Sequence, residues 1–224
     1  MSFTDMGVRA AVQCAGCGSL ERTRLIKLVI DDLDLLGPST RVLHIAPEAG
    51  LARSFVDSGA DCRFVDLDPV GLPGVPGVER LDLCRDLDAI ADRSFDLIVH
   101  SHVLEHVPCN YTYVLFHLHR LLAEEGRIVC CIPFLPGHYG SDTSSDLTDD
   151  QRNERYGQWD HVRRFGTDDL DLSLGRVYDL PETYDARNLV SEQALSAANV
   201  PPHAWTGFTP HSVLVLAKRD YRLA

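Results

Sequence analysis

The chain has 224 residues, of which 45% are hydrophobic and 24% are charged, so disorder, collagen and coiled coil are excluded as descriptions of the whole chain. No stretch approaches the ~18 consecutive apolar residues of a membrane span, and residues 1–13 lack the apolar segment of a signal peptide. The net charge is −12, whereas proteins that bind duplex nucleic acid usually present a basic surface. We therefore expect a cytoplasmic protein, with neither a membrane nor nucleic acid as its partner.

The apolar pattern predicts helices and strands that alternate through the first 132 residues. Helical spacing marks a first helix within residues 19–36, which Gly37 and Pro38 end. The other expected elements are strands at 41–46, 62–65, 79–83, 95–100, 127–132, 176–180 and 212–218, and helices at 51–58, 111–122 and 188–198.

This alternation predicts an α/β fold with a parallel sheet and helices on both faces. Ligands of such sheets bind beyond the carboxyl ends of the strands, so the turns that follow the strands are the places to search. Residues 134–166 form a long polar insertion, of the kind that serves as a lid or a binding loop.

Three signals along the chain favour a nucleotide-like ligand. A turn and a helix start follow the first strand, where backbone N–H groups can receive a polar group. Asp66 ends the next strand, where a carboxylate can accept both hydroxyls of a ribose. Asp82 and Leu83 follow the third strand, where they could flank an adenine. Each signal alone is weak, and their order along the chain is what makes them informative.

The chain resembles class I S-adenosylmethionine-dependent methyltransferases of the type 11 group. The resemblance lies in the segments VLHIAPEAG, FVDLDP, LDLCRDL, SFDLIVHSHVLEHVP and LHRLLAEEGRIVCCIPF, between about residues 41 and 134. The segments CAGCGSLERTR, near the start, and QWDHVRRFG, at residues 158–166, resemble a narrower bacterial branch with a CxxC N-terminus and a DHVRRFG motif.

The resemblance implies a Rossmann-like, seven-stranded, mostly parallel sheet whose last strand, at 212–218, is antiparallel. We expect residues 41–224 to form this domain, with the lid at about 134–166, and residues 1–40 to form a helical cap that carries the CxxC motif.

The resemblance also implies roles for single residues toward S-adenosylmethionine. Its methionine part would be wrapped by His44, Ala46, Glu48 and Gly50 of the first turn. The ribose would be bound by Asp66, and the adenine would be met by Leu67, Asp82 and Leu83. The floor under the sulfonium would be formed by His100 and Ser101.

The first turn departs from the family pattern, because His44 replaces the usual acid and Ala46 and Glu48 replace two usual glycines. Our hypothesis is that Glu48 faces the amino group of the cofactor. The alternative is that Glu48 accepts hydrogen bonds from N–H groups at the helix start.

Methyl transfer requires an aligned nucleophile and often a base, for which histidine is the obvious residue type. We take His161, His102 and His138 as candidates. Tyr139 and Trp159 could cover the acceptor, and Arg163 and Arg164 could clamp an anionic group. The alternative is a lid that is held down by Asp–Arg pairs. The favoured substrate is a small polar or anionic metabolite, methylated on N, O or C.

Seven cysteines without a signal peptide predict thiols or metal ligands in a reducing compartment. Cys14 and Cys17 supply half of a structural zinc site, and there is no second CxxC, so free thiols rank ahead of zinc. His102 and His106, at i and i+4, could form half of another zinc site on a helix, but that site lacks a third ligand.

Two other functions stay open at this stage. The chain could bind S-adenosylmethionine without catalysis, acting as an interaction protein; a homodimer is compatible with the sequence. A nicotinamide-dependent oxidoreductase is disfavoured, because no G-x-G-x-x-G follows the first strand.

Overall fold

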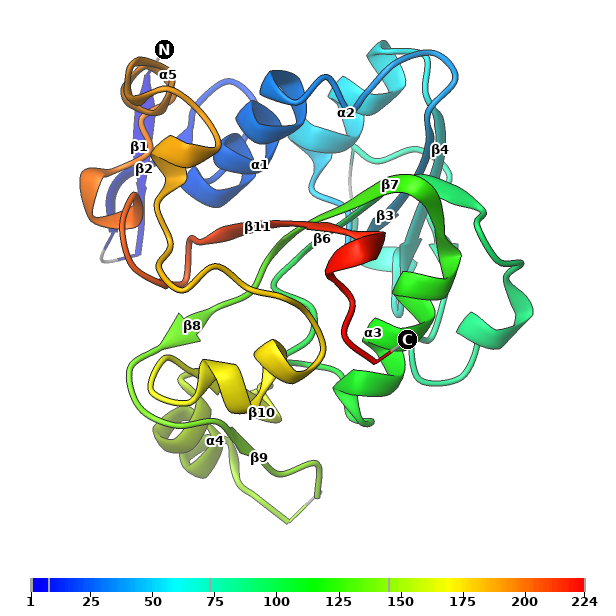
Figure 1. Ribbon diagram of the computed structural model, residues 1–224. Helices are drawn as coiled ribbons and strands as arrows, with labels where there is room; N and C mark the ends of the chain where they lie inside the picture. Colours follow the sequence, from blue (N-terminus) through cyan, green and yellow to red (C-terminus); the bar gives the residue numbers. More distant parts are fainter. Residues whose placement is uncertain (1, 8, 73, 145, 224) are drawn as a thin grey trace.

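The computed structural model describes residues 2–7, 9–72, 74–144 and 146–223, and its centre is a twisted sheet (Figure 1). In the described residues this sheet has six strands, in the order β11-β7-β6-β3-β4-β5. Neighbouring strands are parallel except for β11, which pairs antiparallel with β7. The strands are β3 (Arg41–Ile45), β4 (Asp61–Asp66), β5 (Glu79–Arg80), β6 (Phe95–Ser101), β7 (Leu122–Cys131) and β11 (Val213–Ala217).

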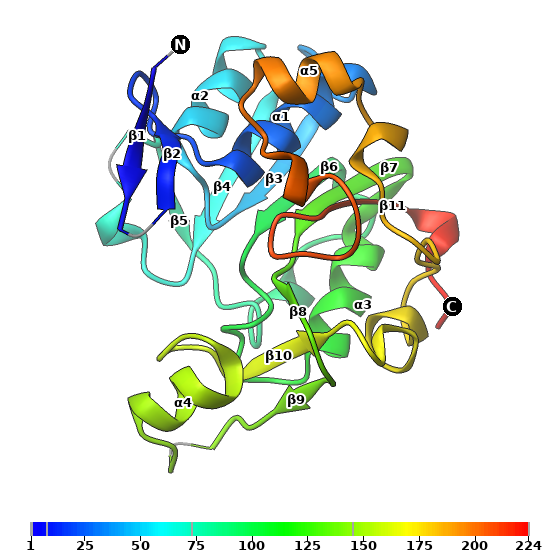
Figure 2. The same ribbon diagram turned by 90° about the vertical axis from the view of Figure 1, so that its left-hand side faces the viewer.

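Helices cover both faces of this sheet, as the alternating pattern predicts (Figure 2). α1 (Glu21–Asp32), α2 (Ala49–Asp57) and α5 (Glu192–Ala197) pack on one face, and α3 (Tyr111–Leu121) packs on the other. Side chains of a strand alternate between the faces, so Leu43 joins the α3 side while Val42 joins the side of α1 and α2.

The strand expected at 176–180 does not form, which is why the sheet has six strands where the resemblance implies seven. The chain there curls into short 3₁₀ helices at Leu170–Leu172 and Leu174–Arg176. The backbone N–H groups of Val177 and Tyr178 both donate to the Leu174 carbonyl, at 2.9 Å each. They are therefore not available to pair with a neighbouring strand. Only an isolated bridge between Tyr178 and Tyr221 is left.

Residues 1–40 contain the expected helix, α1, but a β-hairpin that the sequence did not predict precedes it: β1 (Phe3–Met6) pairs antiparallel with β2 (Arg9–Cys14). The buried guanidinium of Arg24 on α1 holds the hairpin against the helix. It donates to the Val12 carbonyl at 3.0 Å and to the Ala198 carbonyl at 2.6 Å. Extended backbone exposes such carbonyls, whereas a helix would use them internally.

The polar insertion folds into a second small sheet, with the strand order β8-β10-β9. It contains β8 (Phe134–Leu135), β9 (Gly140–Ser141), α4 (Asp149–Tyr156) and β10 (Arg163–Gly166). Thr148 and Gln151 form a capping box at the start of α4, and Gly157, with φ 88°, ends it. In Figures 1 and 2 the insertion lies below the main sheet, on the side where the strands β3 and β6 end.

The remaining elements are short. The helix expected at 188–198 is divided, because the Ser191 side chain caps α5 by accepting from the Ala194 N–H at 3.2 Å. The other 3₁₀ helices are Pro69–Gly71, Leu87–Ala89, Ala186–Asn188, Pro202–Ala204 and Lys218–Asp220. Among the described residues, no helix has both the length and the apolar character that crossing a membrane requires.

Two of the seven cysteines are not free thiols, which corrects the sequence expectation. Cys84 and Cys109 form a disulfide with a Cα–Cα distance of 5.8 Å. The pairing was not apparent from the sequence because 25 residues separate the two positions, and only the folding of the loops that follow β5 and β6 brings them together. Cys14, Cys17, Cys62, Cys130 and Cys131 are free.

Replacing both Cys84 and Cys109 with Ser should lower the free energy of unfolding by roughly 3 kcal/mol, because the unfolded chain regains loop entropy. Urea unfolding of oxidised protein measures the change. Dithiothreitol should destabilise the wild-type protein by a similar amount and leave the double variant unaffected. Equal stability of the oxidised wild-type protein and the variant would contradict the prediction.

Candidate functional site

Two adjoining pockets open where the parallel strands end. The inner pocket, of about 330 Å³, lies at the ends of β3, β4 and β5. The outer pocket, of about 700 Å³, lies between α1, the first turn and the insertion. Both are lined by Ala46, His102, His106 and Asp160, so they meet at these residues.

Besides Asp160, the inner pocket combines two carboxylates from the strand ends with apolar side chains. Asp66 and Asp82 line it together with Leu67 and Leu83, as the sequence analysis expects. Each carboxylate is oriented by its own loop: Asp66 accepts from the Asp68 N–H and Asp82 from the Cys84 N–H, both at 2.8 Å. Carboxylates held in this way are suited to accept hydrogen bonds from hydroxyl or amino groups of a ligand.

The first turn places Ala46 and Glu48 at the outer pocket. Ala46 has a φ of 51°, in the left-handed region where the family pattern has glycine. Glu48 precedes α2 but makes no side-chain capping hydrogen bond, which contradicts the alternative role at the helix start. One carboxylate oxygen lies 3.3 Å from Arg22, and the other is buried without a partner among the described residues.

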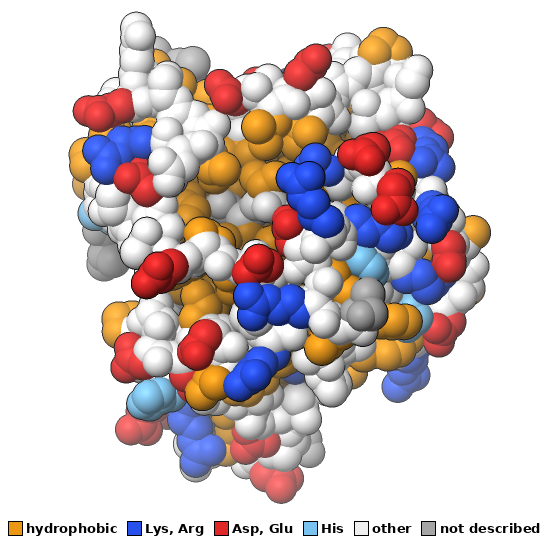
Figure 3. Space-filling model, in the orientation of Figure 1, with side chains coloured by type: hydrophobic (Ala, Val, Ile, Leu, Met, Phe, Trp, Pro, Cys, Tyr) orange, Lys and Arg blue, Asp and Glu red, His pale blue; other side chains and the backbone are white. Residues whose placement is uncertain are grey.

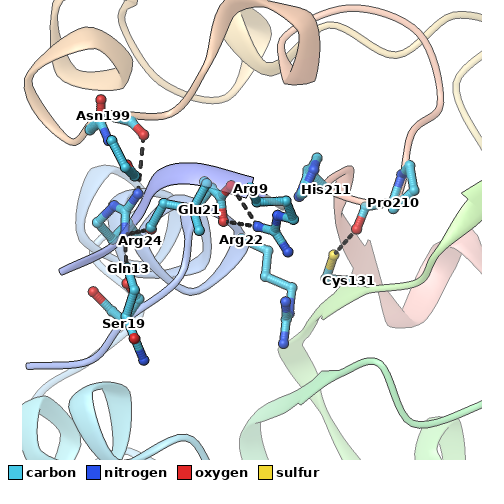
Figure 4. A network of polar contacts seen from close by, with 12 residues as sticks. Arg9, Gln13, Ser19, Glu21, Arg22, Arg24, Cys131, Asn199, Pro210 and His211 are labelled. Carbon is cyan, nitrogen blue, oxygen red and sulfur yellow. Dashed lines mark hydrogen bonds and ion pairs between the residues drawn. The ribbon is translucent and has the colours of Figure 1, made fainter. Parts of the chain in front are cut away.

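Arg22 is a site residue that the sequence analysis missed. It lies on α1, donates from Nε to the Ser101 hydroxyl at 3.2 Å, and pairs with Glu48 through Nη2. Figure 4 shows its side chain beside the ion pair of Arg9 and Glu21 and directed away from that pair. A lone arginine in a helix is no motif, and only the packing of α1 on the sheet carries it to the pocket.

His44 and His100 are core residues and line neither pocket, contrary to expectation. The His44 ring packs 5.2 Å from the Phe55 ring and 5.9 Å from the Phe64 ring, on the α2 side of the sheet. Burial lowers the pKa of His44 to about 3 and that of His100 to about 4, so both rings are neutral. Strand alternation directs the His44 side chain to the face of the sheet that α2 covers.

Gly50 also lies outside the two pockets. A Cβ at this position would lie 3.4 Å from the Cys17 carbonyl oxygen, which is close to ordinary contact distance, so this end of α2 packs against the CxxC turn. Cys17 itself contacts the Ser19 hydroxyl at 3.1 Å. Among the described residues, no third ligand group joins Cys14 and Cys17 in an arrangement that could hold a metal.

The loop after β6 forms turns, so His102 and His106 do not share a helix face as the i, i+4 spacing suggests. His102, with φ 53°, has Nε2 3.0 Å from the Pro210 carbonyl. Burial, reinforced by the charge of Arg22, lowers the pKa of His102 to about 3. This imidazole is a weak base.

A second histidine cluster joins this loop to the insertion. His106 and His161 stack edge to face with ring centroids 4.7 Å apart, next to the fully buried Glu105. His161 is buried, and its Nδ1 lies 3.0 Å from the Tyr156 carbonyl. Asp160 lines the outer pocket together with His161, and its carboxylate lies 3.3 Å from His106. Sequence analysis missed Glu105 as a neighbour of the two histidines.

The other candidates of the insertion lie outside both pockets. Arg163 is buried and donates to the Leu104 and Cys109 carbonyls, which ties the insertion to the loop after β6. Arg164 donates to the His138 carbonyl. Both arginines therefore hold parts of the chain together, where the sequence analysis expected them to clamp an anionic group. Of the remaining three, Tyr139 packs on Tyr111 and Phe165, whereas His138 and Trp159 are exposed.

Comparison with known proteins places the chain in a family. Residues 21–191 match the model of a methyltransferase domain, and the chain therefore belongs to the methyltransferase-domain family. No curated protein is similar enough to count as a match.

Two solved structures share the fold. One is the Burkholderia thailandensis 1,6-didemethyltoxoflavin-N1-methyltransferase with bound 1,6-didemethyltoxoflavin and S-adenosylhomocysteine, at a TM-score of 0.52 and 17% identity over 88% of this chain and 76% of that chain. The other is the [4+2]-cyclase SpnF, at a TM-score of 0.51 and 16% identity over 79% of this chain and 67% of that chain. At such identities the similarity concerns the fold, which hosts more than one chemistry.

The buried His44 predicts acid sensitivity. Its folded-state pKa lies below the unfolded value near 6.5, so its contribution is complete above that pH and is lost as the pH falls toward 3. At pH 5 this single group should lower the free energy of unfolding by about 2 kcal/mol relative to pH 8. In His44→Leu the decrease in the free energy of unfolding between pH 8 and pH 5, measured by urea unfolding, should be smaller by that amount. An unchanged decrease would show that His44 does not cause the loss of stability in acid.

Proposed function

We propose that the chain transfers the methyl group of S-adenosylmethionine to N, O or C of a small polar or anionic molecule. The observation that carries the proposal is that Asp66 and Asp82 line the same pocket, in a chain of the methyltransferase-domain family. The similar fold of a methyltransferase with S-adenosylhomocysteine bound supports the choice of cofactor.

The adenosine would occupy the inner pocket. The Asp66 carboxylate would accept the ribose hydroxyls, and Leu67, Asp82 and Leu83 would surround the adenine. The amino-acid end would reach Glu48 and Arg22, whose opposite charges match an ammonium and a carboxylate. The free Glu48 oxygen supports this pose, because a bound ammonium would satisfy it.

The acceptor would occupy the outer pocket and attack the sulfonium methyl at the junction of the two pockets. In this in-line displacement the S–CH₃ bond breaks as the bond from the acceptor to CH₃ forms, the sulfonium leaves as a neutral thioether, and the acceptor proton is transferred to a base or to solvent. The acceptor proton would pass to His161, whose Nδ1 is held by the Tyr156 carbonyl and whose Nε2 is therefore free.

The other two histidine candidates suit this role less well. His102 lines both pockets, but its Nε2 is engaged by the Pro210 carbonyl and its pKa is lowered to about 3. His138 is exposed, with Nδ1 3.5 Å from Asp169 and away from both pockets.

The second candidate is a protein that binds S-adenosylmethionine without methyl transfer. The departures from the family pattern at Ala46 and Glu48 favour it, and SpnF shows that a [4+2]-cyclase shares the fold. Formation of S-adenosylhomocysteine with any acceptor discriminates between the two functions.

Calorimetric titration should show micromolar binding of S-adenosylmethionine and no binding of NAD. Asp66→Asn should lower the affinity for S-adenosylmethionine about 10- to 100-fold, because a hydrogen bond to a charged group contributes about 1.5–3 kcal/mol. Asp68→Asn is the matched control, since this neighbouring exposed side chain lines neither pocket, and its affinity should equal that of the wild type. Equal weakening in both variants would argue against the ribose contact.

His161→Ala should lower turnover about 100-fold or more, the usual contribution of a positioned base, while the cofactor affinity changes less than twofold. The readouts are S-adenosylhomocysteine formation with an acceptor found by screening, and calorimetry without acceptor. His138→Ala serves as the control and should retain turnover, because His138 is remote from both pockets. Unchanged turnover in His161→Ala would remove this residue from the mechanism.

A further inference from the structure

The cluster of Glu105, His106 and His161 lies beside the outer pocket. Each of the three residues offers one ligand atom, and these atoms all lie within 4.8 Å of one another. They come from two segments, the loop after β6 and the insertion, which Arg163 holds together. The arrangement therefore depends on the fold and not on exposed side chains that meet by chance.

Glu105 is the feature that indicates a missing partner. Its side chain is fully buried, and neither carboxylate oxygen has a hydrogen-bond partner among the described residues. The imidazole of His102 comes near, with Nδ1 3.4 Å from one carboxylate oxygen, but this contact does not have hydrogen-bond geometry. The nearest arginines are already engaged, since Arg163 donates to backbone carbonyls and Arg22 to Ser101 and Glu48. A buried carboxyl group without a hydrogen-bond partner is unfavourable, and a bound cation would satisfy its oxygens.

Both imidazoles are oriented as metal ligands commonly are. His161 can donate from Nδ1 to the Tyr156 carbonyl at 3.0 Å, which leaves the Nε2 lone pair free. His106 has Nδ1 3.3 Å from the Asp160 carboxylate, and its Nε2 lies 3.9 Å from Glu105. Metal-bound histidines usually donate their second ring N–H to a carbonyl or carboxylate, which fixes the ring orientation.

We propose that Glu105, His106 and His161 bind one zinc ion. Two imidazoles and a carboxylate are a donor set that zinc accepts, with a fourth position left for water or substrate. Bonds of about 2.0–2.1 Å require ligand atoms roughly 3.3 Å apart. The cluster would therefore contract on binding, and His106, whose side chain is 33% exposed, has room to rotate.

The fourth position would face the outer pocket, which His106 and His161 line. Zinc there would bind an oxygen of the acceptor or of water and lower its pKa toward about 7. With zinc bound, His161 is a ligand, and the proton of the proposed reaction would be lost from the zinc-bound oxygen. The site itself does not depend on methyl transfer, because zinc binding is measured without cofactor or acceptor.

The test is zinc binding to the full chain, measured as metal content after purification and by calorimetry of metal-stripped protein with zinc chloride. We expect one zinc per chain. Asp160→Ala removes an outer-sphere partner and should lower the zinc affinity roughly 10- to 100-fold. Glu105→Gln and His161→Ala each remove a ligand and should lower the zinc affinity by more than that. Thermal unfolding without metal shows that each variant is folded; Glu105→Gln should be at least as stable as the wild type.

The double variant Cys14→Ser, Cys17→Ser is the control, because the CxxC pair is the other place where zinc could bind. It should still bind one zinc. Cobalt provides a second readout, since a thiolate-to-cobalt charge-transfer band would place the ion at the cysteines. The proposal is overturned if the wild type binds no zinc, if the cysteine variant loses it, or if folded Glu105→Gln binds it unchanged. Failure of zinc binding with S-adenosylmethionine binding intact would leave the proposed function standing.

Discussion

The site depends on the parallel pairing of β3 with β4 and with β6. Ile45 pairs with Val65 on one side and with His100 on the other, so three strands end at the same level. The residues that follow them, Ala46, Asp66 and His102, then meet at one edge although they are distant in sequence. Backbone hydrogen bonding thus assembles the pockets before any side chain contributes. The turn at Ala46 is itself held by its N–H, which donates to the Val65 carbonyl at 2.9 Å.

A buried guanidinium and a backbone hydrogen bond join the insertion to this edge. Arg163 donates to two carbonyls of the loop after β6, and the Val162 N–H donates to the Glu105 carbonyl at 2.9 Å. Because these bonds fix β10 against the loop, His161 is held beside His106 and not on a freely moving lid. Acidic and basic side chains are mixed over the face of the molecule drawn in Figure 3, with no single dominant charge on that face.

Sequence analysis placed the residues that follow parallel strands more reliably than those of other segments. Asp66 and Asp82 follow strands whose bounds the apolar pattern predicts within a few residues, and the position after a parallel strand fixes where such a side chain lies. His44, Gly50 and His100 were expected at the same site and line neither pocket. Arg22 and Glu105 belong to no such pattern, because only long-range packing brings them to the site. Arg163 shows the converse error: an arginine in a polar insertion is a plausible anion ligand until its burial against backbone carbonyls is known.

The departures in the first turn are explained by what replaces the usual groups. His44, in place of an acid, fills core space between Phe55 and Phe64, where a carboxylate would be unfavourable. Glu48, in place of a glycine, brings a carboxylate into the outer pocket, where Arg22 balances its charge. Compared with the family pattern, the acid of this turn therefore lies at the helix start and not on the strand. A polar anchor is still available at this end of the site, although it now comes from a different position of the chain.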